Sequence, residues 1–170
     1  MAKTIATRSS VSAEGPAEAP ASARKQDLHQ YKPIDPKDAY VLVVEDNLQN
    51  LVLIARLLAF IGVRRYEWKA SGWQVLEFAD TMPRVDLVLM DLHLPYEDGY
   101  DALTKLRSDP RFAETRVVAV TADANPASME KAKNSGFDGF LGKPIDPDKF
   151  PDQIIAILQG QSVWDLGYQN

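Results

Sequence analysis

Three acidic residues in this sequence stand directly after apolar runs, where their carboxylates could share one site. Glu45 and Asp46 follow residues 40–44, and Asp91 follows residues 86–90. We predict below that these apolar runs are the first and third strands of a parallel sheet with the strand order 2-1-3-4-5. In that order the two strands are neighbours, and their carboxyl ends meet at one rim of the sheet. Crowded carboxylates repel one another unless a cation lies between them. We therefore expect a divalent ion there, and Mg²⁺ fits better than Ca²⁺ because it takes few carboxylates and keeps several waters.

A hydroxyl and an amine follow two later strands at the same predicted rim. Thr121 ends the run 117–120, and Lys143 comes soon after the short apolar pair 140–141. An Asp carboxylate beside a cation can attack a phosphoryl group and form an aspartyl phosphate. A metal ion and an amine then neutralise the phosphoryl oxygens, and a hydroxyl donates to one of them. The pattern predicts Asp91 as the nucleophile, assisted by the other two side chains.

Short apolar runs alternate with segments of helical period over most of the chain. The predicted strands are residues 40–44, 66–69, 86–90, 117–120 and 140–141, and the predicted helices contain residues 51–61, 73–79, 102–106, 126–134 and 151–158. Continuously apolar strands are typical of parallel sheets that are covered on both faces. Each parallel crossover needs a helix, so the sequence predicts an α/β, doubly wound fold of five strand–helix units with the order 2-1-3-4-5.

Composition excludes several classes of protein. The 170 residues suit one domain, and 45% hydrophobic residues can build a core. A net charge of −5 argues against direct DNA binding. The absence of cysteine excludes disulfides and thiolate metal sites, and favours the cytoplasm. The longest apolar run, residues 51–63, is interrupted by Arg56 and is too short to cross a bilayer, so we expect no membrane attachment.

The predicted domain has a tail on each side. Residues 1–36, rich in Ala, Ser, Pro and Glu, are predicted to be a disordered N-terminal tail, residues 37–160 the domain, and residues 161–170 a short C-terminal tail. The three tryptophans, Trp68, Trp73 and Trp164, fall outside the predicted crevice, and Trp164 and Tyr168 in the C-terminal tail are candidates for a partner contact.

Five short blocks accompany these features: VVEDN at 43–47, MDLHLP at 90–95, DG at 98–99, VTA at 120–122 and KP at 143–144. Their order and spacing, from about residue 39 to residue 158, resemble those of response regulator receiver domains in two-component signalling. The resemblance implies a flavodoxin-like receiver fold with Asp91 as the phosphoacceptor. It also implies that Asp46 holds Mg²⁺ directly and Glu45 holds it through water, while Asp91 and the backbone carbonyl of His93 complete the protein ligands.

The resemblance assigns further roles around the phosphoryl group. Thr121 would bind a phosphoryl oxygen and Lys143 would pair with it, and Phe140 matches an aromatic switch that turns inward as Thr121 moves. The His93 side chain and Asp123 stand where receiver residues tune the lifetime of the phosphoryl group. Two positions depart from the commoner pattern, because Glu45 replaces an Asp and Phe140 replaces a Tyr.

The resulting hypothesis is a stand-alone, cytoplasmic response regulator, monomeric or weakly dimeric. A histidine kinase or histidine phosphotransfer protein would phosphorylate it, and a downstream protein would bind residues 126–158. It would catalyse only its own phosphorylation and dephosphorylation. Two alternatives remain open: a receiver-like scaffold that works without phosphorylation, and a small phosphatase or other hydrolase on a similar sheet.

Overall fold

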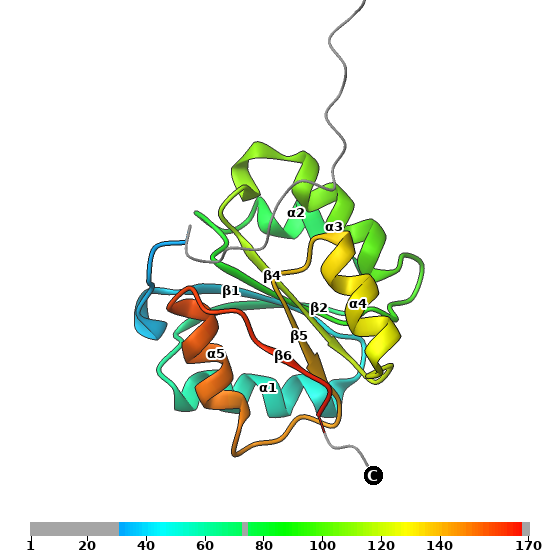
Figure 1. Cartoon of the computed structure of the whole chain (residues 1–170). Helices are drawn as coiled ribbons and strands as arrows, with labels where there is room; N and C mark the ends of the chain where they lie inside the picture. Colours follow the sequence, from blue (N-terminus) through cyan, green and yellow to red (C-terminus); the bar gives the residue numbers. More distant parts are fainter. Residues whose placement is uncertain (1–30, 73–74, 168–170) are drawn as a thin grey trace, which may run out of the picture.

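A single parallel sheet forms the centre of the molecule. The computed structural model describes residues 31–72 and 75–167, and in this part of the chain six strands pair in the order β2-β1-β3-β4-β5-β6 (Figure 1). All neighbours are parallel. The strands are β1 (Tyr40–Val44), β2 (Arg65–Lys69), β3 (Leu87–Met90), β4 (Arg116–Thr121), β5 (Gly139–Gly142) and β6 (Trp164–Asp165).

Helices cover both faces of this sheet. Helices α1 and α5 lie on one face, and α2, α3 and α4 lie on the other (Figure 1). The α-helices are α1 (Leu48–Phe60), α2 (Val75–Ala79), α3 (Gly99–Ser108), α4 (Pro126–Ser135) and α5 (Phe150–Leu158), and two 3-10 turns are η3 (Pro36–Asp38) and η5 (Pro110–Phe112). The predicted doubly wound fold is therefore confirmed, including the order of its first five strands.

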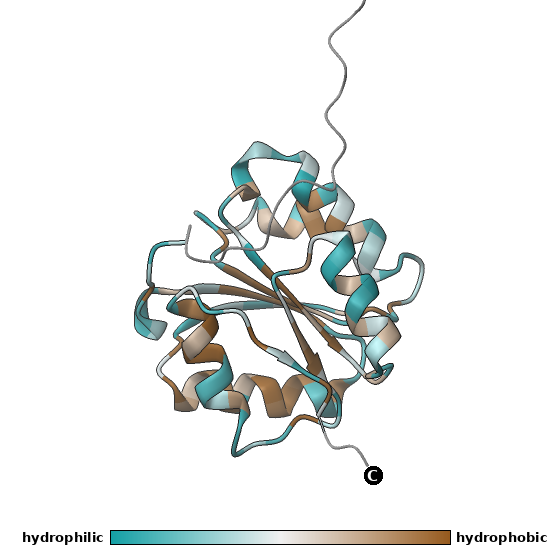
Figure 2. Ribbon diagram, in the orientation of Figure 1, coloured by the Kyte–Doolittle hydropathy of each residue, from teal (hydrophilic) through white to brown (hydrophobic). Residues whose placement is uncertain are grey.

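Successive residues of the central strands are buried on opposite faces. Val41 and Val43 of β1 pack in the cluster shared with α1 and α5, whereas Leu42 and Val44 pack in the cluster shared with α2, α3 and α4. Figure 2 shows the central strands as a hydrophobic layer between the helices; α4 is mostly hydrophilic, whereas α1 is hydrophobic over much of its length, with Leu48, Val52 and Phe60 exposed. Because both faces are covered, these runs lack polar alternation.

The C-terminal segment differs from the prediction of a simple tail. Trp164 and Asp165 form β6, which pairs with Phe140 and Leu141 at the edge of the sheet. The sequence predicted five strands, and β6 is a sixth strand that it did not predict. A strand of two residues has no hydrophobic period of its own, and it forms here because β5 offers an unpaired edge. Tyr168 lies outside the described residues.

Residues before the predicted domain boundary also contact the domain. The backbone N–H of Ile34 donates to the carbonyl of Leu158 at 2.9 Å, and Nη2 of Arg116 donates to the carbonyl of Lys32 at 2.6 Å. Ile34 and Lys32 precede the predicted boundary at residue 36, so the contacts with the domain begin before it. Residues 1–30 lie outside the described part of the chain. Within residues 31–72 and 75–167, no helix has the length and apolar character needed to cross a bilayer.

Candidate functional site

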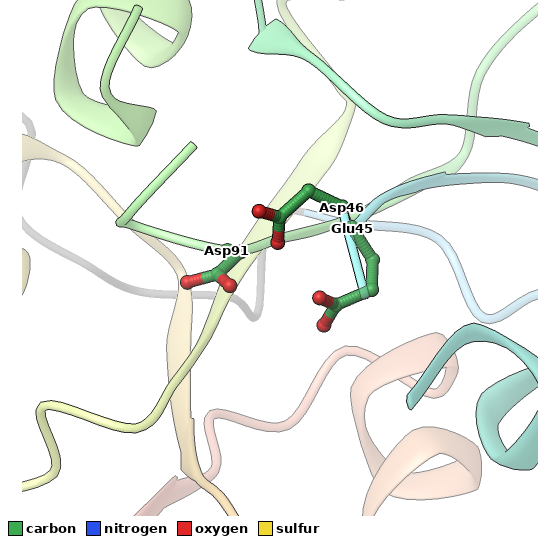
Figure 3. A group of neighbouring side chains, drawn as sticks. All are labelled: Glu45, Asp46 and Asp91. Carbon is green, nitrogen blue, oxygen red and sulfur yellow. The ribbon is translucent and has the colours of Figure 1, made fainter. Parts of the chain in front are cut away.

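The three predicted acidic residues meet at the carboxyl end of the sheet. Strands β1 and β3 are direct neighbours, and the N–H of Asp91 donates to the carbonyl of Val44 at 2.9 Å. One carboxylate oxygen each from Glu45, Asp46 and Asp91 lie within 4.8 Å of one another. Figure 3 shows the three carboxylates around one common space. Glu45 and Asp91 are buried and Asp46 is exposed.

Lys143 places its ammonium group between two of these acids. Its Nζ lies 2.6 Å from Oε2 of Glu45 and 2.7 Å from Oδ2 of Asp91. Burial alone would lower the pKa of Lys143, but the hydrogen bonds and negative charges of Asp91 and Glu45 outweigh it and raise the pKa above its ordinary value. Lys143 is thus held as a cation at the end of β5.

Backbone N–H groups fix the orientation of the two buried acids. Oδ1 of Asp91 accepts from the N–H of His93 at 3.0 Å, and Oε1 of Glu45 accepts from the N–H of Asn47 at 2.9 Å. The Asn47 side chain caps α1 by accepting from the N–H of Asn50. Each carboxylate is therefore held by its own loop on one oxygen and by Lys143 on the other.

The loop after β4 brings the hydroxyl and a second acid to the same rim. Thr121 is fully buried, and its Oγ1 accepts from the N–H of Asp123 at 3.1 Å. Oδ2 of Asp123 lies 3.8 Å from Nε2 of His93, and both side chains are well exposed at the mouth of the site. The main chain joins this loop to the lysine, because the N–H of Lys143 donates to the carbonyl of Thr121 at 2.8 Å.

The predicted switch aromatic and one tryptophan lie close to this rim. Phe140 is fully buried on β5, in the cluster that includes α4. Trp68, which we placed outside the crevice, donates from Nε1 to the carbonyl of Glu45 at 2.7 Å. Its position one residue before the end of β2, opposite Val43, could have revealed this contact. Trp73 lies outside the described residues.

The charges of the site suit one divalent cation. Three carboxylates and one ammonium group leave two negative charges in a partly buried space. The donor atoms are all oxygens, the set that hard cations prefer, and the exposed Asp46 leaves room for water ligands. The arrangement can therefore hold a divalent ion beside Asp91 and offer this carboxylate to an incoming phosphoryl group.

Comparisons with known proteins identify relatives of the same kind. The family model described as response regulator receiver domain matches residues 41–155. The chain is 36% identical over 123 residues to the signal transduction histidine-protein kinase BarA of Escherichia coli K12, covering 72% of this chain and 13% of BarA. It is 31% identical over 118 residues to the polar-differentiation response regulator DivK of Brucella anthropi, covering 69% of this chain and 94% of DivK. The match to BarA thus concerns a small part of a much longer protein.

Solved structures agree with the sequence comparisons. The receiver domain of the sensor histidine kinase PA1611 from Pseudomonas aeruginosa, solved with a magnesium ion in its active site cleft, superposes with a TM-score of 0.63 at 30% identity, covering 72% of this chain and 98% of that one. The chemotaxis response regulator CheY4 of Vibrio cholerae shares the fold, with a TM-score of 0.63 at 24% identity over 68% of this chain and 95% of that one. Fold, site and sequence together show that this chain belongs to the response regulator receiver domain family of two-component systems.

Proposed function

We propose that Asp91 accepts a phosphoryl group from a phosphohistidine of a histidine kinase or a histidine phosphotransfer protein. The observation that carries the proposal is the position of Asp91, which shares the ammonium group of Lys143 with Glu45 and lies beside the carboxylates of Glu45 and Asp46. A nucleophilic carboxylate needs nearby positive charge to accept a second anion, and this rim supplies one cation and the ligands for another.

The reaction moves one phosphoryl group between two side chains. A carboxylate oxygen of Asp91 forms a bond to phosphorus while the P–N bond of the phosphohistidine breaks, and the imidazole leaves. Lys143 neutralises charge on the phosphoryl oxygens, and the hydroxyl of Thr121 donates to one of them. In a separate step, water attacks the phosphorus, the P–O bond to Asp91 breaks and inorganic phosphate leaves, which returns Asp91 to a free carboxylate. We propose that the protein catalyses only this gain and loss of its own phosphoryl group.

Mg²⁺ fits the acidic cluster as the partner of this chemistry. Asp46 and Asp91 would bind it directly, Glu45 through water, and the backbone carbonyl of His93 would add a ligand. Bound Mg²⁺ would supply positive charge to the transferring phosphoryl oxygens. The related receiver of PA1611 holds magnesium in its cleft, which supports the same ion here.

Signalling would follow from a shift between two conformations. Phosphorylation changes the contacts of Thr121 and Phe140, and a downstream protein binds the altered surface of residues 126–158. We propose that the protein acts in the cytoplasm as a monomer or weak dimer and signals through protein binding and not through direct DNA binding, which its net charge of −5 supports.

Incubation with Mg²⁺ and acetyl phosphate, followed by intact mass spectrometry, tests the acceptor. Wild type gains one phosphoryl group, Asp91→Asn gains none, and Asp101→Asn, an exposed acid on α3, behaves as wild type. A Mg²⁺-dependent gain that persists in Asp91→Asn would place the acceptor elsewhere. No gain in wild type would favour a scaffold, and multiple turnover of phosphomonoesters would favour a hydrolase.

A further inference from the structure

The C-terminal strap, residues 163–167, covers the open edge of β5 and reaches three elements (Figure 1). The N–H of Phe140 donates to the carbonyl of Val163 at 2.9 Å. On the α4 side, Nζ of Lys133 lies 5.0 Å from the centre of the Trp164 ring. On the α5 side, Nε2 of Gln153 donates to Oδ2 of Asp165 at 2.7 Å.

The side chains of the strap alternate between both hydrophobic clusters. Val163 packs against the cluster that contains α1 and α5, whereas Trp164 and Leu166 pack against the cluster that contains α3 and α4. This period of two is that of a strand with apolar side chains on both faces. The strap is therefore a fitted part of the sheet edge.

The far end of the strap packs against the two loops that carry the site. A Cβ at Gly142, the residue before Lys143, would overlap the backbone of Leu166 and would lie 2.8 Å from Cβ of Ala124. Ala124 belongs to the loop after Thr121. Leu166 thus lies against the backbone that positions both the amine and the hydroxyl of the site.

The hydrogen-bonded pairing that holds the strap is short. Only two residue pairs of β5 and β6 stand in register among the described residues, Phe140 with Trp164 and Leu141 with Asp165. Segments with few paired groups open at a small fraction of the global unfolding free energy. The side chains of the strap therefore contribute much of what holds it, and opening of the strap would break no pairing among the five other strands.

We propose that docking of the C-terminal strap is coupled to phosphoryl binding at Asp91, with Trp164 and Leu166 acting as positioning residues. The inference rests on the proposed function. The docked strap fixes Gly142 and the loop after Thr121, so Lys143 and Thr121 are already placed when a phosphoryl group arrives. Coupling is reciprocal, so a protein that lifts the strap weakens phosphoryl binding by the same factor by which phosphoryl binding favours the docked strap.

Beryllofluoride with Mg²⁺, a phosphoryl analogue, measures the first half of the coupling. A chain that ends at Ser162 and the variant Trp164→Ala bind beryllofluoride at least about fivefold more weakly than wild type, the lower end of usual coupling factors. Trp164→Phe restores most of the affinity because it keeps an aromatic ring on the cluster. Tyr66→Ala, which removes an exposed aromatic at the opposite edge in β2, leaves the affinity unchanged.

Hydrogen exchange on the unaltered chain measures the other half, and it decides the question if the shortened chain does not fold. Beryllofluoride slows exchange of the Phe140 amide and of the strap amides by the same factor. Equal or tighter binding in the shortened chain or in Trp164→Ala, or strap exchange that ignores beryllofluoride, would overturn the coupling. If wild type neither binds the analogue nor gains a phosphoryl group, the proposed function itself fails.

Discussion

At the scale of single residues, Asp91 and Glu45 each receive one hydrogen bond from their own loop and share the ammonium group of Lys143. Lys143 compensates one of the three negative charges, and within residues 31–72 and 75–167 no lysine or arginine forms an ion pair with the exposed Asp46. The remaining repulsion weakens the native state until a cation binds.

Mg²⁺ is therefore expected to stabilise the folded protein. An ion that binds only the native state adds about 1.4 kcal/mol to the unfolding free energy at ten times its Kd. Thermal unfolding should show a higher Tm with Mg²⁺ for wild type and for the control Asp101→Asn, and a much smaller rise for Asp46→Asn. An equal rise in Asp46→Asn would exclude this residue as a ligand.

His93 and Asp123 lie together at the mouth of the site, 3.8 Å apart. Both side chains are polar and exposed beside the loop of the proposed acceptor, so we expect His93→Ala and Asp123→Ala to change the rate of phosphoryl loss while both variants still become phosphorylated. The decay of the mass gain after removal of acetyl phosphate measures this rate. Unchanged decay in both variants would remove the idea of lifetime control.

At the scale of elements, the loop between β3 and α3 holds the acceptor by close backbone packing. The N–H of Gly99 donates to the carbonyl of Leu92 at 3.0 Å, and a Cβ at Gly99 would lie 2.6 Å from the carbonyl oxygen of Asp91. Only glycine fits at this position without movement of the acceptor's own backbone.

Gly99→Ala should therefore impair both stability and phosphorylation. The added methyl group forces the loop apart, at a cost of about 1–3 kcal/mol in unfolding free energy. Chemical denaturation measures the first effect, and the rate of mass gain with acetyl phosphate measures the second. Thr104→Ala, on the exposed side of the same helix, should change neither. Wild-type stability in Gly99→Ala would show that the loop relaxes freely.

How far the sequence predicts each element depends on where its stabilising contacts lie. Strand β1 could be predicted from the sequence because residues 40–44 are themselves apolar on both faces of the strand. The acids that follow β1 and β3 could be placed together because strand order alone decides which carboxyl ends are neighbours. By contrast, Trp164 joins the sheet only through contacts with β5, α4 and α5. The contact of Trp68 with Glu45 likewise depends on pairing across strands.

At the scale of the whole molecule, an ion pair joins α3, β4 and the start of β5 at the end of the sheet away from the site. Oδ2 of Asp138 accepts from Nη2 of Arg107 at 2.6 Å and from the N–H of Val117 at 2.9 Å. Burial raises the pKa of Asp138 above its ordinary value, and the charge of Arg107 offsets this only in part.

Asp138 should make stability fall as pH rises. Its folded pKa lies above its unfolded value of 3.8, so its contribution is full below that value and is lost as pH rises through the folded pKa. The Asn in Asp138→Asn does not titrate, so the unfolding free energy of this variant, measured relative to wild type from acid to neutral pH, should increase as pH rises. A difference that moves the other way would mean that Arg107 dominates.

The length and charge of the two edge strands, β6 and β2, affect how readily the sheet can pair with a second copy of the chain. One edge, β6, is two residues long, and the other, β2, presents the exposed charges of Arg65 and Glu67. Short or charged edges discourage one sheet from adding to the next. While the strap is docked, both edges of the sheet are therefore poor templates for pairing with a second copy of the chain.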